Sequence, residues 1–173
     1  MHPARKPKSG IPRRVYALCL LALAGITACP AAQPGGEGYP RSAMEIRGKS
    51  GRQWFNVVIA DTQARQELGL MYVRSLPSDA GMLFPQRSPQ PMSMWMKNTL
   101  IPLDMLFIDA RGRIVCLLEN AKPQSLDILS CDKPVKAVLE INGGEAHKRG
   151  IRVGDRVTQG LWPHSVSPSN SAA

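Results

Sequence analysis

The sequence lacks the short motifs that mark the best-defined catalytic and cofactor sites. It has only three histidines in 173 residues, and no two of them have the spacing of a zinc-binding motif. It also has no Gly-x-Ser-x-Gly elbow, no complete phosphate-binding glycine loop and no dinucleotide fingerprint. These absences remove the mechanisms that a sequence reveals most readily, although they do not exclude an enzyme. We expect no cofactor.

Long apolar runs are also scarce. The most extended one, residues 15–28, is shorter than the roughly 20 residues of a membrane-spanning helix. It follows a basic start and is typical of an export signal. We therefore predict that residues 1–28 are a signal peptide and that the remaining chain is a soluble, exported protein.

The end of this apolar run, Ile26-Thr27-Ala28-Cys29, resembles the lipobox of bacterial lipoproteins, in which cleavage exposes the cysteine for acylation. We predict lipidation of Cys29, which would anchor the protein to the periplasmic or cell-surface face of a bacterial membrane. A conventional signal peptide with a chance cysteine is the alternative.

The basic character of the chain comes partly from this leader. The formal net charge is +9, but five Lys and Arg and no acidic residues precede residue 29, so the remainder carries +4. The basic residues of the remainder are scattered rather than clustered with aromatic residues, as a nucleic-acid interface would require. We predict no nucleic-acid partner.

Two of the four cysteines, Cys116 and Cys131, fall within the body of the domain. In an oxidising compartment they could form a disulfide. Two separate small apolar side chains are the alternative, because the sequence does not fix the distance between the two Cα atoms.

Composition divides the rest of the chain into three parts. Residues 29–41 are rich in Pro, Gly and Ala and indicate a flexible tether. Residues 42–161 have the size of a single domain. The polar residues 162–173 indicate a disordered tail.

Within the domain, hydrophobic patterns predict a mainly β, α+β fold with a compact, barrel-like antiparallel sheet. One short helix is expected over residues 62–70, with Asp61 as its N-cap and Ala64, Leu68 and Met71 on one face. A second helical turn is expected over residues 145–149. The predicted strands are residues 43–47, 53–60, 81–85, 92–96, 103–108, 113–118, 135–141 and 156–159.

The candidate functional site is a set of polar side chains that lie between apolar stretches of the sequence. The candidate ligand-binding residues are Lys97, Asn98, Thr99, Asp104 and Glu140. If Glu140 shares a pocket with Asp104, the two carboxylates become candidates for acid-base catalysis and Lys97 for electrostatic stabilisation. The structural alternative is a turn at positions 98 and 99 and a partly buried ion pair made by Lys97.

A methionine series suggests a separate hypothesis. Along a strand Met92, Met94 and Met96 would project to one face and Trp95 to the other. Thioethers are soft ligands that suit Cu(I). Methionine also fills irregular cores, which is the alternative explanation.

Several ordered motifs resemble those of the DUF192 family, a prokaryotic domain of unknown function. The motifs are Arg65-x-x-x-Gly69-Leu-Met71, Arg74-x-Leu76, Gly81-Met-Leu-Phe84, Trp95-Met-Lys-Asn-Thr99, Ile101-Pro-Leu-Asp104, Phe107-Ile-Asp109 and Val138-Leu-Glu-Ile-Asn-Gly-Gly144. The family usually keeps Arg and Gly three apart, and it usually has an aromatic residue where Met94 stands. The resemblance spans about residues 44 to 158 and implies a compact β-barrel-like fold without a known reaction.

These observations predict an exported, lipid-anchored module that binds a small polar ligand or an envelope component. An enzyme that uses Asp104 or Glu140 with Lys97 is the alternative. A Cu(I)-binding protein or a purely structural, partner-binding protein is the third interpretation.

Overall fold

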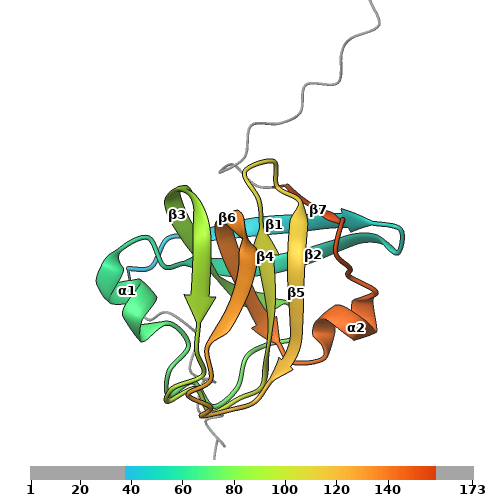
Figure 1. The fold of residues 1–173 in the computed structure, drawn as a ribbon. Helices are drawn as coiled ribbons and strands as arrows, with labels where there is room; N and C mark the ends of the chain where they lie inside the picture. Colours follow the sequence, from blue (N-terminus) through green and yellow to red (C-terminus); the bar gives the residue numbers. More distant parts are fainter. Residues whose placement is uncertain (1–37, 159–173) are drawn as a thin grey trace, which may run out of the picture.

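The computed structural model describes residues 38–158 and has seven strands and two short helices (Figure 1). The fold is mainly β, and its single sheet curls into a half-barrel, which confirms the predicted fold class. The strands are β1 Arg41–Gly48, β2 Gly51–Ile59, β3 Ala80–Met94, β4 Leu103–Ile108, β5 Ile114–Ala121, β6 Leu129–Asn142 and β7 Arg156–Thr158. The helices are α1 Gln63–Leu68 and α2 Glu145–Arg149, which lie on opposite sides of the curled sheet in Figure 1. No described helix has the length and hydropathy needed to cross a bilayer.

The strands follow one another across the sheet in the order β5-β4-β6-β3-β2-β1-β7. All neighbours are antiparallel except β2 and β3, which run parallel. A parallel pair needs a crossover connection, and α1 lies within this connection. The prediction of an antiparallel sheet is therefore wrong for this one pair.

Backbone hydrogen bonds join the two edges of the sheet at one end. Ile114 at the start of β5 donates to the carbonyl of Asp155, and Gly154 donates to the carbonyl of Ile114, at 2.9 and 2.8 Å. An isolated bridge between Arg113 and Arg156 extends this contact. Closing edges in this way removes unpaired backbone groups that would otherwise be exposed.

The sheet is covered by apolar side chains on both faces. All six residues of β4 are buried, and alternate positions contribute to two different cores. The strand core takes members from all seven strands: Met44, Ile46, Phe55, Val57, Leu83, Leu106, Ile108, Ile114, Ala137, Leu139, Ile141 and Val157, with Ala146 and Ile151. The loop-side core includes Val58, Leu70, Leu76, Met82, Phe84, Met96, Met105, Phe107 and Val138. The second core draws on the connections after α1 and after β3.

The predicted N-cap of α1 is wrong. Thr62, not Asp61, is the N-cap, and its hydroxyl accepts from the Arg65 amide at 3.3 Å. None of the helix residues is buried, and Leu68 is exposed. Gly69 ends the helix with a positive φ of 49°, and Leu70, just beyond it, makes the apolar contact instead.

The two strands predicted over residues 81–85 and 92–96 are one long strand, β3. It pairs with β6 along its length, with register shifts between Pro85 and Gln90 and between Gln90 and Met92. Proline lacks a backbone N–H, and such irregularities are where a strand accommodates it. The long partner β6 thus overrides the local signal to break the strand. β3 ends at Met94, so strand alternation does not extend to Met96.

The described residues reach into the predicted tether, because β1 begins at Arg41 and the Gly38 carbonyl accepts from Arg65 at 2.9 Å. The predicted signal peptide, Cys29, most of the tether and the tail lie outside the described residues.

Candidate functional site

The structure separates the polar residues that the sequence places together. Lys97 is exposed, and its ammonium group lies 5.2 Å from the centroid of the Trp95 ring. Asn98 adopts a positive φ of 56° in a turn, a conformation that Asn tolerates better than most residues. Its amide donates to the Tyr72 hydroxyl at 2.9 Å. The predicted turn is present, whereas neither of these two residues lines the pocket between α1 and β3 that is described below.

Asp104 is fully buried and has three backbone partners. One carboxylate oxygen accepts from the amides of Asn120 and Gly144 at 2.8 and 2.9 Å, and the other accepts from Ala146 at 2.8 Å. Gly144 and Ala146 belong to the N-terminal turn of α2, where backbone amides lack helical partners. Asp104 therefore ties α2 to β5, which is a structural role.

Asp104 and Glu140 do not converge. In the pairing of β4 with β6, Asp104 lies opposite Ile141 and Met105 lies opposite Glu140. Directly opposed residues share a face, and successive residues alternate between faces. Asp104 therefore projects to the face of the strand core and Glu140 to the face of the loop-side core. The predicted constellation of two carboxylates and Lys97 is not assembled.

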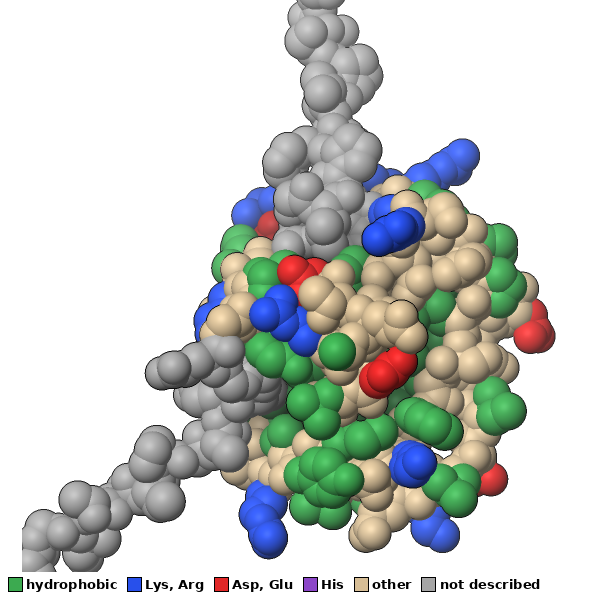
Figure 2. Space-filling view, turned by 90° about the vertical axis from the view of Figure 1, so that its left-hand side faces the viewer, with side chains coloured by type: hydrophobic (Ala, Val, Ile, Leu, Met, Phe, Trp, Pro, Cys, Tyr) green, Lys and Arg blue, Asp and Glu red, His purple; other side chains and the backbone are tan. Residues whose placement is uncertain are grey.

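Glu140 instead lines a pocket of about 370 Å³ between α1, β3 and the loop that follows β3. Thr99 is the other predicted ligand residue that lines it. We call this cavity the α1–β3 pocket. Its lining residues are Gln63, Gln66, Glu67, Leu68, Gly69, Leu70, Met71, Phe84, Gln86, Gln90, Pro91, Met92, Ser93, Met94, Trp95, Thr99 and Glu140. Figure 2 views the molecule from the α1 side, and hydrophobic side chains gather over the lower half of that face.

The Glu140 side chain is unusual in having no protein partner. Only 4% of its surface is exposed, and its carboxyl group makes no hydrogen bond or ion pair with any residue in the described range 38–158. Burial raises the pKa of Glu140 from its ordinary value of 4.5 to about 8, because desolvation disfavours the charged form. At neutral pH the group is a carboxylic acid that can both donate and accept a hydrogen bond.

Most of this pocket could not be predicted from local sequence patterns, because its residues are brought together by contacts between distant segments. Gln66 is an example: its side-chain amide donates to the carbonyls of Ala60 and Pro85, at 3.0 and 2.8 Å, and so holds α1 against β3. Met71 and Trp95 come from different connections, and no sequence pattern links them to Glu140. The sequence singles out Trp95 beside the methionine series and in a family motif, but nothing in these patterns places it near Glu140.

The methionine hypothesis requires a correction. Met92 and Met94 line the α1–β3 pocket, but Met96 is fully buried in the loop-side core and does not. Met71 supplies a third thioether to the pocket instead. Among residues 38–158, no cluster of three or more His, Cys, Asp or Glu side chains is arranged to hold a metal ion.

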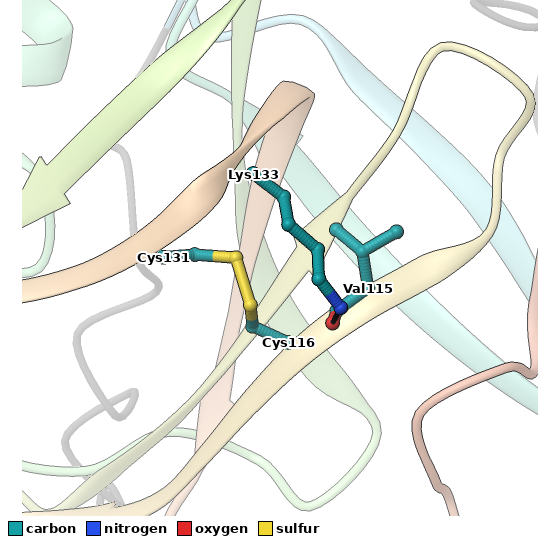
Figure 3. The surroundings of a disulfide bond; sticks show 4 residues. All are labelled: Val115, Cys116, Cys131 and Lys133. Carbon is teal, nitrogen blue, oxygen red and sulfur yellow. Dashed lines mark hydrogen bonds between the residues drawn. A yellow bond between two sulfur atoms is a disulfide. The ribbon is translucent and has the colours of Figure 1, made fainter.

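Cys116 and Cys131 are joined by a disulfide with a Cα–Cα distance of 6.1 Å (Figure 3). The bond connects β5 to β6, which are separated in the sheet by β4. Lys133 lies beside it, and its ammonium group donates to the Val115 carbonyl at 3.1 Å. The bond therefore joins two strands of the curled sheet that are not direct neighbours, and Cys131 pairs with Met92, which lines the α1–β3 pocket.

Comparison with known proteins gives the family context. The model of the family DUF192, described as "Uncharacterized ACR", matches residues 44–159. No curated protein matches the chain.

Two solved structures are similar. One is a candidate transcription regulator from Sinorhizobium meliloti 1021, which is 40% identical over 69% of this chain and 94% of that chain, with a TM-score of 0.68. The other is a protein of unknown function from Novosphingobium aromaticivorans DSM 12444, which is 38% identical over 75% of this chain and 94% of that chain, with a TM-score of 0.70.

Proposed function

The chain belongs to the DUF192 family, and we propose that it acts as an exported, lipid-anchored module that binds a small polar ligand in the α1–β3 pocket. One observation carries the proposal. The wall of the pocket holds a carboxyl group, that of Glu140, which is buried and has no partner among the described residues.

Glu140 lines the pocket and is not enclosed on all sides, so a ligand in the pocket can reach its carboxyl group. Such a ligand can supply the hydrogen-bond partner that the described residues do not provide, and a net gain of about 1 kcal/mol is typical of one hydrogen bond. The lining mixes apolar and polar side chains. Phe84, Leu70 and the methionines supply apolar surface, and Thr99 and Glu140 lie among further polar residues: Gln63, Gln66, Glu67, Gln86, Gln90 and Ser93.

A fragment screen tests the binding proposal. We expect fragments to shift the nuclear magnetic resonance signals of Trp95, Met71 and Thr99 in the wild-type chain. Replacing half-buried Met94 by Trp fills the pocket and should abolish these shifts. The matched control is Val153→Trp, which places the same side chain at an exposed position outside the pocket. Fragments that bind equally to the Met94→Trp variant, or the absence of any binding fragment, would refute a ligand site here.

Export and anchoring form the second part of the proposal. The lipobox-like residues 26–29 support it, and so does the disulfide, since such bonds persist mainly in oxidising compartments. Expression in bacteria with a clickable fatty acid should label the wild-type protein in the membrane fraction and leave Cys29→Ser unlabelled. An unlabelled wild-type protein would remove the anchor from the proposal.

The presence of Met71, Met92 and Met94 in one pocket favours a second candidate, a Cu(I) site. Competition with a Cu(I) chelator distinguishes the two candidates. If the protein takes Cu(I) from the chelator and the Met92→Leu and Met94→Leu variants do not, the copper site is favoured. If the chelator keeps the Cu(I), the copper site is excluded. The enzyme alternative is weakened, because Asp104 is engaged by three backbone amides and lies on the face opposite Glu140.

A further inference from the structure

We infer that the ligand of the α1–β3 pocket is a small organic cation, an amine with an apolar body whose ammonium group pairs with Glu140. The inference rests on the proposed ligand-binding function and specifies the class of ligand.

The charges around the pocket select against anions. Among its 17 lining residues, the ionisable side chains are Glu67 and Glu140, and no Lys, Arg or His lines it. Glu67 accepts from Gln63 at 2.8 Å and sits on the exposed surface of α1. Among the lining residues, an anionic ligand would meet two acidic groups and no base. A cation would meet complementary charge at the buried wall, where Glu140 lies, whereas at the mouth the ammonium group of Lys97 lies over the Trp95 ring.

Among the described residues, none of those that pair with Glu140 or line the pocket with it is a cation. The strands on either side place Met82 and Met105 directly opposite it. Across the pocket, α1 presents Gln63, Gln66 and Glu67, and the loop after β3 presents Thr99. An incoming ammonium group would therefore be the cationic partner of this carboxyl group.

The walls suit the remainder of such a ligand. Aromatic faces attract cations through the ring quadrupole, and Trp95, which is 51% exposed, stands at the mouth of the pocket. Lys97 already places its ammonium group 5.2 Å from the Trp95 ring centroid, so a cationic ligand at this ring would have to displace the lysine side chain. Phe84, Leu70 and the flexible thioether chains of Met71, Met92 and Met94 can then enclose an apolar body.

Binding of a cation would be coupled to loss of a proton. Free Glu140 is protonated below about pH 8, and an adjacent ammonium group favours the ionised form. The O–H proton would pass to solvent as the carboxylate forms, so one proton leaves for each ligand bound. A neutral hydrogen-bonding ligand would release no proton and would bind better below pH 8 than above it.

Phenethylamine and 2-phenylethanol provide a matched pair of probes, because they share an apolar body and differ in charge. Titration calorimetry between pH 6 and 8 should show tighter binding of the amine, with affinity that rises up to about tenfold per pH unit. Glu140→Gln, which keeps the size of the neutral group, should abolish both the preference and the pH dependence. Glu119→Gln, at an exposed position of β5 that does not line the pocket, is the control and should leave both intact.

Three results would overturn the inference: equal affinity for amine and alcohol, an amine preference that survives Glu140→Gln, or no binding of either probe at millimolar concentration. If the fragment screen nevertheless finds neutral ligands that Met94→Trp excludes, the proposed binding function stands and only the ligand class is wrong.

Discussion

Asp104 and Glu140 are both buried carboxyl residues on paired strands, and the pleat of the sheet gives them opposite environments. Asp104 faces backbone amides that satisfy it, whereas Glu140 faces a pocket and has no partner within residues 38–158. The hydrogen bonds available to each group, rather than burial itself, decide which is structural and which is a candidate for binding.

Removal of the Asp104 carboxylate should strongly destabilise the domain. Asp104→Ala leaves three amide donors without their acceptor, and each unsatisfied buried group costs about 1–3 kcal/mol. Chemical denaturation should therefore show a loss of several kcal/mol. Asp132→Ala, at an exposed position in β6, should change stability little. A loss no greater than that of the control would mean that Asp104 does not hold α2 and β5 together.

Glu140 should make the stability of the free protein decrease as pH rises. Its pKa is about 8 in the folded state and near 4.5 when unfolded, so the folded state binds more protons between these values. Stability should thus fall from pH 4.5 through pH 8, and Glu140→Gln should lack this decline. Thermal unfolding of the wild type and of Glu140→Gln across pH 5 to 9 measures the two pH profiles. Parallel profiles would contradict the raised pKa of Glu140.

Glu145 affects the stability of the fold at lower pH than Glu140 does. Its hydrogen bond with Arg149 lowers the pKa of Glu145 below its ordinary value of 4.5. The stability that this carboxylate contributes is present above pH 4.5 and is lost as pH falls through its lower folded-state pKa.

At the scale of elements, the positions of α1, β3 and β6 depend on their partners more than on local sequence. α1 buries none of its own residues, and Gln66 fixes it by hydrogen bonds to Ala60 and Pro85. β3 remains continuous through three prolines because β6 supplies a long partner. Gly81 also lets β3 approach β6 closely, because a Cβ atom at this position would lie only 2.6 Å from the Glu140 carbonyl oxygen.

The disulfide should stabilise the link between β5 and β6. Its two cysteines are 15 residues apart, and closing a loop of that size is worth about 3 kcal/mol in the chain-entropy model. Cys116→Ala combined with Cys131→Ala should lower the free energy of unfolding by about this amount. Dithiothreitol should destabilise the wild-type domain similarly and leave the double variant unchanged. Equal stability with and without reductant in the wild type would contradict the prediction.

At the scale of the whole molecule, the described residues contain two cores that share the sheet between them. The members of both cores lie between Tyr39 and Val157. The joined edges of β5 and β7 lie within the same limits. The described residues therefore hold two cores and a sheet whose edges are joined, which are the features expected of a domain that folds as one unit.

A chain limited to residues 38–158 should unfold cooperatively at the same temperature as residues 30–173. Calorimetry of the two proteins, both with the disulfide formed, makes the comparison. A markedly lower midpoint for the shorter chain would show that residues beyond these limits contribute to the domain.

Local signals predicted much of the fold. The limits of β4 and α2 follow closely from a short apolar run and from a break at Asn142-Gly143-Gly144 followed by a helical turn. Local signals failed for the N-cap of α1 and for β3, where contacts between distant segments overrule propensity. The candidate site was predicted in part, since Thr99 and Glu140 line the pocket whereas Lys97, Asn98 and Asp104 do not.

The sequence by itself determined the strand-rich pattern, the family motifs and the lipobox-like leader, because these depend on residues that are adjacent or regularly spaced. Only the tertiary structure decided that Asp104 and Glu140 face opposite sides and that Met71 and Trp95 join Glu140 around one pocket. The physical reason is strand register. A shift of one residue in the pairing of β4 with β6 would move every side chain of the shifted strand to the opposite face of the sheet. The register that forms is the one that packs best across the whole sheet.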